Sequence, residues 1–134
     1  MARVEVKKKD LLYPELSYEI IGCAFEVFNE LGSGHSEKYY QKALSICFRQ
    51  APLNFQEQAY YPLKFKNEIV GKNFLDFVVE NKIVVEIKKD VRYSKSHIDQ
   101  VLRYLKTSNL KLAILINFGK EGVTYKRIVN IDNS

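Results

Sequence analysis

The chain has 134 residues, of which 46% are hydrophobic and 28% charged, so it is long enough for a core and a disordered chain is excluded. Its net charge of +5 is a mild bias towards polyanionic partners and is far below the basicity of histone-like proteins. The charged start argues against a signal peptide and no apolar run approaches the roughly 20 residues that span a membrane, so we expect a cytoplasmic protein without membrane contact. We expect one domain, residues 13–134, after a flexible basic lead-in, residues 1–12.

Two helices are predicted at the start of this domain. Apolar residues recur every three or four positions over residues 16–31, and again over residues 37–50, as on the buried stripe of a helix. Ser36 is placed to cap the second helix. The cysteines, Cys23 and Cys47, fall on the inward stripes, so we expect two buried, reduced thiols.

Four strands are predicted next, because apolar, β-branched and aromatic residues alternate with turn residues. The expected strands are 54–65, 68–70, 74–79 and 83–88. The first two form a hairpin around Lys66-Asn67, Gly71-Lys72 links the second to the third, and Glu80-Asn81-Lys82 turns into the fourth.

The last part of the chain predicts a helix and two further strands. The helix opens at Ser94 and runs to about Lys106, and the strands are 111–118, which is almost wholly apolar, and 123–131. A buried strand that follows a helix indicates a crossover connection and some parallel pairing. The expected fold class is therefore α/β or α+β, with a mixed sheet flanked by helices.

Charged residues interrupt the most apolar strands, where charge is costly unless it is paired or binds a metal. They are Asp76 in the third strand and Glu86 and Lys88 in the fourth. A two-residue turn between these strands would place Glu86 on the face away from Asp76. A three-residue loop, or a bulge near Asp76, would instead bring both carboxylates to one face.

With the second arrangement, Asp76 and Glu86 can bind one Mg²⁺ ion, with the Ile87 carbonyl as a further ligand. Water on the ion would be the nucleophile, and Lys88 would orient that water or stabilise negative charge on phosphorus. The alternative is an exposed edge strand that carries an ordinary Glu–Lys pair.

Other candidates lie on the helices. Glu37 falls on the stripe of the second helix that carries Tyr40, although a carboxylate in a first turn is also explained by the helix dipole. Gln100 and Tyr104 lie four apart on one side of the third helix, with His97 one turn earlier, which equally fits a polar face against solvent. Basic residues that could contact phosphates, or simply be solvated, cluster around the same helix: Arg92, Lys95, Arg103 and Lys106.

The segment Gly34-His35-Ser36-Glu37-Lys38-Tyr39-Tyr40 matches the signature GxxExxY, and nearly the whole chain resembles the GxxExxY family of the PD-(D/E)XK nuclease superfamily. Asp76…Glu86-Ile87-Lys88 and a QxxxY motif, Gln100 to Tyr104, belong to the same resemblance. It implies a restriction-endonuclease-like fold with an αβββαβ core. Leu75 stands where the superfamily's name has Pro.

The resemblance also implies roles for individual residues. Metal ligands would be Glu37, Asp76, Glu86 and the Ile87 carbonyl, and the catalytic set would be Glu37, Asp76, Glu86, Lys88 and Gln100. Substrate contacts are expected from Tyr40, Lys95, His97, Arg103 and Tyr104. The implied cofactor is Mg²⁺, or Mn²⁺ in its place.

The main hypothesis is thus a metal-dependent nuclease that hydrolyses phosphodiester bonds, with DNA favoured over RNA as the substrate. The alternative is a nuclease-fold module that binds nucleic acid or a protein without cutting. Because the chain is small, target specificity would have to come from a homodimer or a protein partner.

Overall fold

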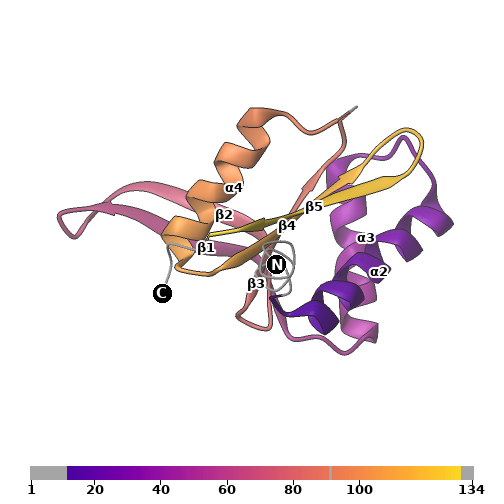
Figure 1. Ribbon diagram of the computed structural model, residues 1–134, viewed down its shortest axis with the longest axis horizontal. Helices are drawn as coiled ribbons and strands as arrows, with labels where there is room; N and C mark the ends of the chain where they lie inside the picture. The colour runs from indigo at the N-terminus through magenta and orange to yellow at the C-terminus, as the bar shows by residue number, and fades with distance from the viewer. Residues whose placement is uncertain (1–11, 91, 131–134) are drawn as a thin grey trace, which may run out of the picture.

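The structure is a computed structural model and describes residues 12–90 and 92–130; most of the expected lead-in lies outside this range. Its elements, labelled as in Figure 1, are three helices and five strands. The helices are α2 (Pro14–Leu31), α3 (Glu37–Gln50) and α4 (Lys95–Ser108). The strands are β1 (Phe55–Phe65), β2 (Glu68–Val79), β3 (Ile83–Lys88), β4 (Leu112–Phe118) and β5 (Val123–Val129).

The strands form one mixed sheet in the order β1-β2-β3-β4-β5. β3 and β4 are parallel and joined through α4, whereas the other neighbours are antiparallel. The crossover predicted from the apolar strand after a helix is therefore confirmed. The segment α3-β1-β2-β3-α4-β4 reproduces the expected αβββαβ core.

Helices cover both faces of the sheet and enclose two apolar clusters. On one face α2 and α3 bury residues such as Tyr40 and Phe48 against Phe77 of β2 and Val85 of β3. On the other face α4 packs Val101 and Leu105 against the sheet. The two faces of β3 are thus both buried, which explains why its sequence is a nearly continuous apolar run.

Local sequence signals set the helix ends. Pro14 opens α2, and Gly32, with a φ of 75°, ends it by donating its amide to the Phe28 carbonyl. The Ser36 hydroxyl accepts a hydrogen bond from the Tyr39 amide, so its predicted capping of α3 is confirmed. Cys23 and Cys47 are buried and free, in agreement with the expectation.

The prediction of two separate strands at 68–70 and 74–79 is wrong, because β2 runs unbroken from Glu68 to Val79. Gly71 pairs with Leu63, and Lys72 pairs with Pro62, so the expected link is part of the ladder. The hairpin turn at Lys66-Asn67 is confirmed: both residues have positive φ values, 49° and 68°, as a two-residue type I′ turn requires.

The hairpin of β1 and β2 extends beyond the rest of the sheet. Its two strands share ten residue pairs, from Phe55↔Val79 to Phe65↔Glu68, whereas β2 and β3 share three. Residues 59–75, which we call the ribbon, therefore continue as two strands alone. Their base, at Ala59 and Leu75, is buried under α4, and their outer part projects at the left of Figure 1.

None of the helices in the described ranges combines the length and the apolar character needed to cross a membrane.

Candidate active site

The loop between β2 and β3 has three residues, Glu80-Asn81-Lys82, and pairs Val79 with Ile83. Glu80 and Asn81 adopt left-handed backbone conformations, with φ values of 54° and 55°. The pairing continues to Phe77↔Val85, so the next residues on the two strands, at positions 76 and 86, come opposite each other. Of the registers considered from the sequence, the one that brings both carboxylates to one face is confirmed.

Asp76 and Glu86 are joined by reciprocal bonds between side chain and backbone. The Asp76 amide donates to Glu86 Oε2 at 2.7 Å, and the Ile87 amide donates to Asp76 Oδ2 at 2.9 Å. These two bonds replace the regular ladder at the point where β2 leaves β3. They also hold the two carboxyl groups side by side.

Glu86 is 4% exposed, and its surroundings favour the neutral acid. Burial raises the pKa of the Glu86 carboxyl well above its ordinary value, and the adjoining Asp76 carboxyl raises this pKa further. The Lys88 ammonium opposes the rise but does not cancel it. With both carboxyl groups ionised, the pair would carry negative charge that Lys88 does not balance and that a bound cation would neutralise.

Gln58 of β1, which the sequence analysis missed, lies opposite Asp76. Its φ is 51°, and its amide nitrogen lies 3.4 Å from Asp76 Oδ1 and 3.2 Å from Gln41 Oε1 of α3. At the same point the alternation of side chains along β2 is interrupted. Leu75 packs under α4, whereas Phe77, two residues later, packs under α2 and α3. In a regular strand residues two apart share a face, so this irregularity positions Asp76 at the boundary between the faces. No Gly or Asn at 58 signalled it.

α4 brings Tyr104 and Gln100 to the carboxylate pair. Burial raises the pKa of the Tyr104 hydroxyl, and the nearby charges of Glu86 and Asp76 raise it further. The Gln100 side chain hydrogen-bonds to Tyr104 and opposes this rise. Tyr104 is therefore near enough to the two acids for their charges to act on it, and Gln100 is bonded to Tyr104; the catalytic and substrate-binding roles of both residues stay predictions.

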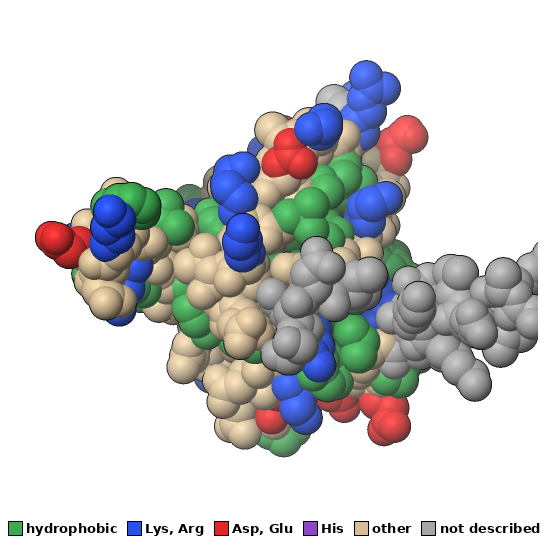
Figure 2. Space-filling view, turned by 60° about the vertical axis from the view of Figure 1, so that its left-hand side comes forward, with side chains coloured by type: hydrophobic (Ala, Val, Ile, Leu, Met, Phe, Trp, Pro, Cys, Tyr) green, Lys and Arg blue, Asp and Glu red, His purple; other side chains and the backbone are tan. Residues whose placement is uncertain are grey.

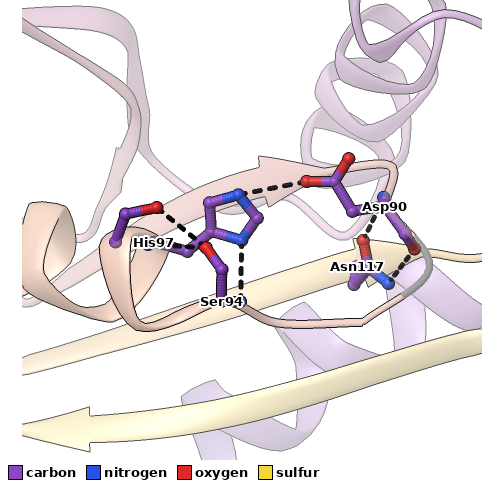
Figure 3. Close-up of polar contacts among 5 residues, drawn as sticks. Asp90, Ser94, His97 and Asn117 are labelled. Atoms are coloured by element: carbon purple, nitrogen blue, oxygen red, sulfur yellow. Dashed lines mark hydrogen bonds and ion pairs between the residues drawn. The ribbon is translucent and has the colours of Figure 1, made fainter.

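The chain after Lys88 is clamped to β4 by Asn117 (Figure 3). Asn117 is 2% exposed, accepts a hydrogen bond from the Asp90 amide at 2.8 Å and donates one to the Asp90 carbonyl at 2.8 Å. Lys88 and Asn117 are the last residue pair of β3 and β4. The Asn117 side chain therefore bonds the backbone just beyond the end of β3, where strand pairing has stopped. An isolated polar residue in the apolar strand 112–118 was the available signal.

His97 has a structural role in α4 (Figure 3). Its Nδ1 accepts from the Ser94 amide at 3.3 Å, and the Ser94 hydroxyl accepts from the His97 amide at 3.2 Å, which forms a capping box. Nε2 lies 3.0 Å from the Asp90 carboxylate. Both ring nitrogens are thus engaged within the protein, and a substrate contact by His97 stays a prediction.

Glu37 does not lie on a buried stripe, and that expectation is wrong. It is the first residue of α3 and is exposed, as are Lys38 and Tyr39 after it, because the buried side of the helix begins only at Tyr40. Over the described ranges, no three His, Cys, Asp or Glu side chains converge on a position where they could hold an ion. A metal would therefore be held by the Asp76–Glu86 pair, and the part of Glu37 in binding it stays a prediction.

Tyr40 was expected to contact substrate, and the structure contradicts this. Its side chain is fully buried, stacks on Phe118 with ring centroids 4.3 Å apart and donates its hydroxyl proton to the Gly32 carbonyl at 2.7 Å. The same hydroxyl lies 3.4 Å from the His35 amide. Tyr40 therefore fixes the α2–α3 loop from inside the core.

The basic residues of α4 differ in their availability. Lys95 forms an exposed ion pair with Asp99 at 3.1 Å, one turn along the helix. Arg103 is exposed and precedes Tyr104, whose pKa it lowers. Arg103 is thus an exposed cation beside Tyr104, whereas Lys95 already has a partner.

Two solved structures are similar to this chain in fold. The protein described as "Crystal structure of SSO0001" has a TM-score of 0.57 and 16% identity over 69% of this chain and 49% of its own; this chain thus spans about half its length. An alkaline exonuclease (LHK-Exo) from Laribacter hongkongensis has a TM-score of 0.50 and 12% identity over 81% and 77%. At these identities both show a shared fold. No curated protein matches the sequence.

A family model described as PD-(D/E)XK nuclease superfamily matches residues 14–128. The match includes both acids, Lys88 and the QxxxY segment of α4. With most of the sequence matched and the αβββαβ core in place, the chain belongs to the PD-(D/E)XK nuclease superfamily.

Proposed function

We propose that this protein is a metal-dependent nuclease that hydrolyses phosphodiester bonds in DNA. The observation that supports it most is the contact between the Asp76 and Glu86 carboxyl groups, with Lys88 two residues further on β3. Asp76 interrupts the apolar end of β2, and Glu86 and Lys88 interrupt the apolar strand β3. Stability does not explain these charges, because a pair of acids held in such surroundings without a cation costs free energy.

The residues fit a divalent cation. The two carboxyl groups adjoin, burial and mutual repulsion favour the neutral form of Glu86, and a cation would remove that repulsion. Mg²⁺ is commonly held by one or two carboxylates together with water and substrate phosphates, so Asp76, Glu86 and the Ile87 carbonyl suffice as protein ligands. Such a cation would supply a Lewis acid and a water of lowered pKa. Mn²⁺ would fit the same ligands.

The chain's own groups have separable tasks in this proposal. Asp76 and Glu86 bind the cation, and Gln58 and the Ile87 amide orient Asp76. Lys88 stabilises the negative charge that develops on the phosphoryl oxygens. Tyr104, held by Gln100, contributes a hydroxyl beside the acids that can hydrogen-bond a phosphate oxygen.

The test is incubation of the chain with single- and double-stranded DNA and RNA, in Mg²⁺ or Mn²⁺, beside a Lys88→Ala variant. We expect cleavage of DNA that a metal chelator abolishes and that the variant slows by roughly 10²–10³-fold. Lys42→Ala, an exposed lysine of α3, is the matched control and should cut like the wild type. Equal cleavage by Lys88→Ala and the wild type would refute the assigned role.

A second candidate is a nuclease-fold module that binds nucleic acid without cutting it. The exposed position of Glu37 favours it, because the third acid expected in the metal site is not beside the other two. Binding of DNA with no cleavage in either metal would select this candidate. The finer assignment to the GxxExxY family and a cytoplasmic location belong to the same proposal, and they rest on the sequence.

A further inference from the structure

The outer part of the ribbon exposes large apolar side chains to solvent. Of the thirteen large hydrophobic residues that are exposed in the described ranges, six lie in the ribbon. They are Tyr60, Leu63, Phe65, Ile69, Val70 and Phe74, with exposed fractions between 45% and 63%. A two-stranded hairpin gains little stability from such side chains in water, so they point to a binding role.

Two of these residues form an aromatic platform. Tyr60 and Phe74 are cross-strand partners, with ring centroids 5.3 Å apart and planes tilted by 32°, and each is about half exposed. Phe74 precedes Asp76 by two residues, which is about 7 Å along an extended strand. The neighbouring residues Tyr61 and Leu75 pack under α4, so the two rings lie on the opposite face of the ribbon, near the segment of β2 that carries Asp76.

The charge of the ribbon is positive. Lys64, Lys66 and Lys72 are exposed, against a single acid, Glu68. Lys72 lies two residues beyond Phe74 on the same strand, and the Lys66 ammonium lies 5.3 Å from the centroid of the Phe65 ring. Figure 2 shows blue lysine or arginine and green hydrophobic surfaces side by side on the projecting part at its left. Alternating rings and cations suit a ligand with flat apolar faces and negative charge.

We infer that the ribbon binds single-stranded DNA, with a base stacked on the Tyr60–Phe74 platform and the ribbon lysines on the phosphates. This inference rests on the proposed function and names its substrate class. Stacking on exposed rings requires an unpaired base, because neighbouring base pairs cover the base faces in a duplex. A second copy of the chain fits less well, since a two-fold contact between ribbons would bring the same lysines together.

The experiment measures binding apart from cleavage. The full chain with Asp76→Asn, which cannot cut in this proposal, is titrated against a fluorescein-labelled thymidine oligonucleotide and a duplex of equal length, by fluorescence anisotropy. Adding Tyr60→Leu and Phe74→Leu keeps apolar strand residues but removes both rings. We expect roughly 10- to 100-fold weaker binding of the single strand and less than threefold change for the duplex. Tyr18→Ala on α2, whose ring is 80% exposed, should bind like the parent.

Lysine variants test the charge separately. Each of Lys64→Ala and Lys72→Ala should lower the slope of log affinity against log salt by about 0.7 for the single strand if its ammonium contacts a phosphate. Unchanged slopes in both variants would overturn the phosphate contacts. Thermal melting checks that every variant is folded before binding is compared.

The outcomes separate the two proposals. If the leucine variant binds the single strand as tightly as its parent, the ribbon inference fails, whatever the wild type cleaves. If sedimentation shows a dimer that the leucine variant dissociates while single-strand binding is unchanged, the ribbon is a dimer contact and the inference again fails. If ribbon-dependent binding is found but the wild type never cuts, the inference holds and the proposed nuclease activity fails.

Discussion

The two faces of the sheet differ in chemistry although the same strands form both. Under α2 and α3, residues such as Tyr40, Phe48 and Phe77 are fully buried, and the Tyr40 hydroxyl is hydrogen-bonded within the protein. Under α4, the outer end of β3 carries Glu86 and Lys88 instead. One face thus stabilises the fold, and the other gives up part of its apolar packing to hold charge. Substitutions on the two faces should therefore change different properties.

The largest expected effect is on the stabilising face. Phe48 is fully buried and packs its ring against Phe55 and Phe77, so Phe48→Ala should lower the free energy of unfolding by about 3–5 kcal/mol. Urea denaturation measures the loss, and Ile46→Ala, at an exposed position of the same helix, is the control. A loss below about 1 kcal/mol would mean that α3 does not anchor the core.

On the charged face, Glu86→Gln should have the opposite effect on the metal-free protein. Because the pKa of Glu86 is raised in the folded state, folding takes up a proton above the ordinary pKa, and the wild type loses stability as the pH rises from acid towards neutrality. The variant lacks this loss, so its stability relative to the wild type should grow over the same range.

The same variant tests metal binding. Mg²⁺ at 100 times its Kd should stabilise the wild type by about 2.7 kcal/mol and leave Glu86→Gln nearly unchanged. Thermal melting with and without metal, at several pH values, measures both effects. If the variant is strongly destabilised and the wild type shows no shift with Mg²⁺ or Mn²⁺, Glu86 is a structural ion-pair partner, and the binding module becomes the better account.

A smaller effect is expected for Tyr40→Phe. The change removes the hydrogen bond to the Gly32 carbonyl and keeps the stacking on Phe118, so it should cost about 0.5–1.5 kcal/mol. Cleavage per folded molecule should not change, because the hydroxyl faces the core. A large loss of activity at unchanged stability would return Tyr40 to the substrate contacts.

The smallest effects sharpen the distinction within α4. Lys95→Ala breaks an exposed ion pair with Asp99 and should change the free energy of unfolding by less than about 0.5 kcal/mol, with little effect on DNA binding. Arg103→Ala should leave stability unchanged but weaken DNA binding and reduce its salt dependence. Equal effects of both variants on binding would show that α4 contributes only general positive charge.

What the sequence predicted well was local. The Lys66-Asn67 turn, the Ser36 cap and the three-residue loop at Asn81 depend on backbone preferences of the residues themselves, and all are present. The contact between Asp76 and Glu86 followed from that loop, because counting residue pairs back from Val79 and Ile83 places positions 76 and 86 opposite each other. The grouping with Tyr104 needed the resemblance, because spacing on a helix does not say which strand the helix crosses.

What the sequence did not predict depends on tertiary contacts. Tyr40 is part of a motif and carries a polar group, which suggested function, but its hydroxyl is bonded to the Gly32 carbonyl of the preceding loop and its ring stacks on Phe118 of β4. Gln58 adopts a left-handed conformation that its residue type does not favour, so only the neighbouring strand explains it. Gly71-Lys72 resembled a break because the pairing partner, not the residue type, keeps that segment extended.

The loop at Glu80-Asn81-Lys82 also decides which motif spacings can work. The nine residues between Asp76 and Glu86 consist of three from β2, three from the loop and three from β3. Shortening or lengthening both strands together adds or removes residues in twos, so with a three-residue loop the spacing must remain odd. A two-residue turn would require an even spacing. A search for similar chains can therefore allow the number of residues between the two acids to vary, provided that this number is odd with a three-residue loop and even with a two-residue turn.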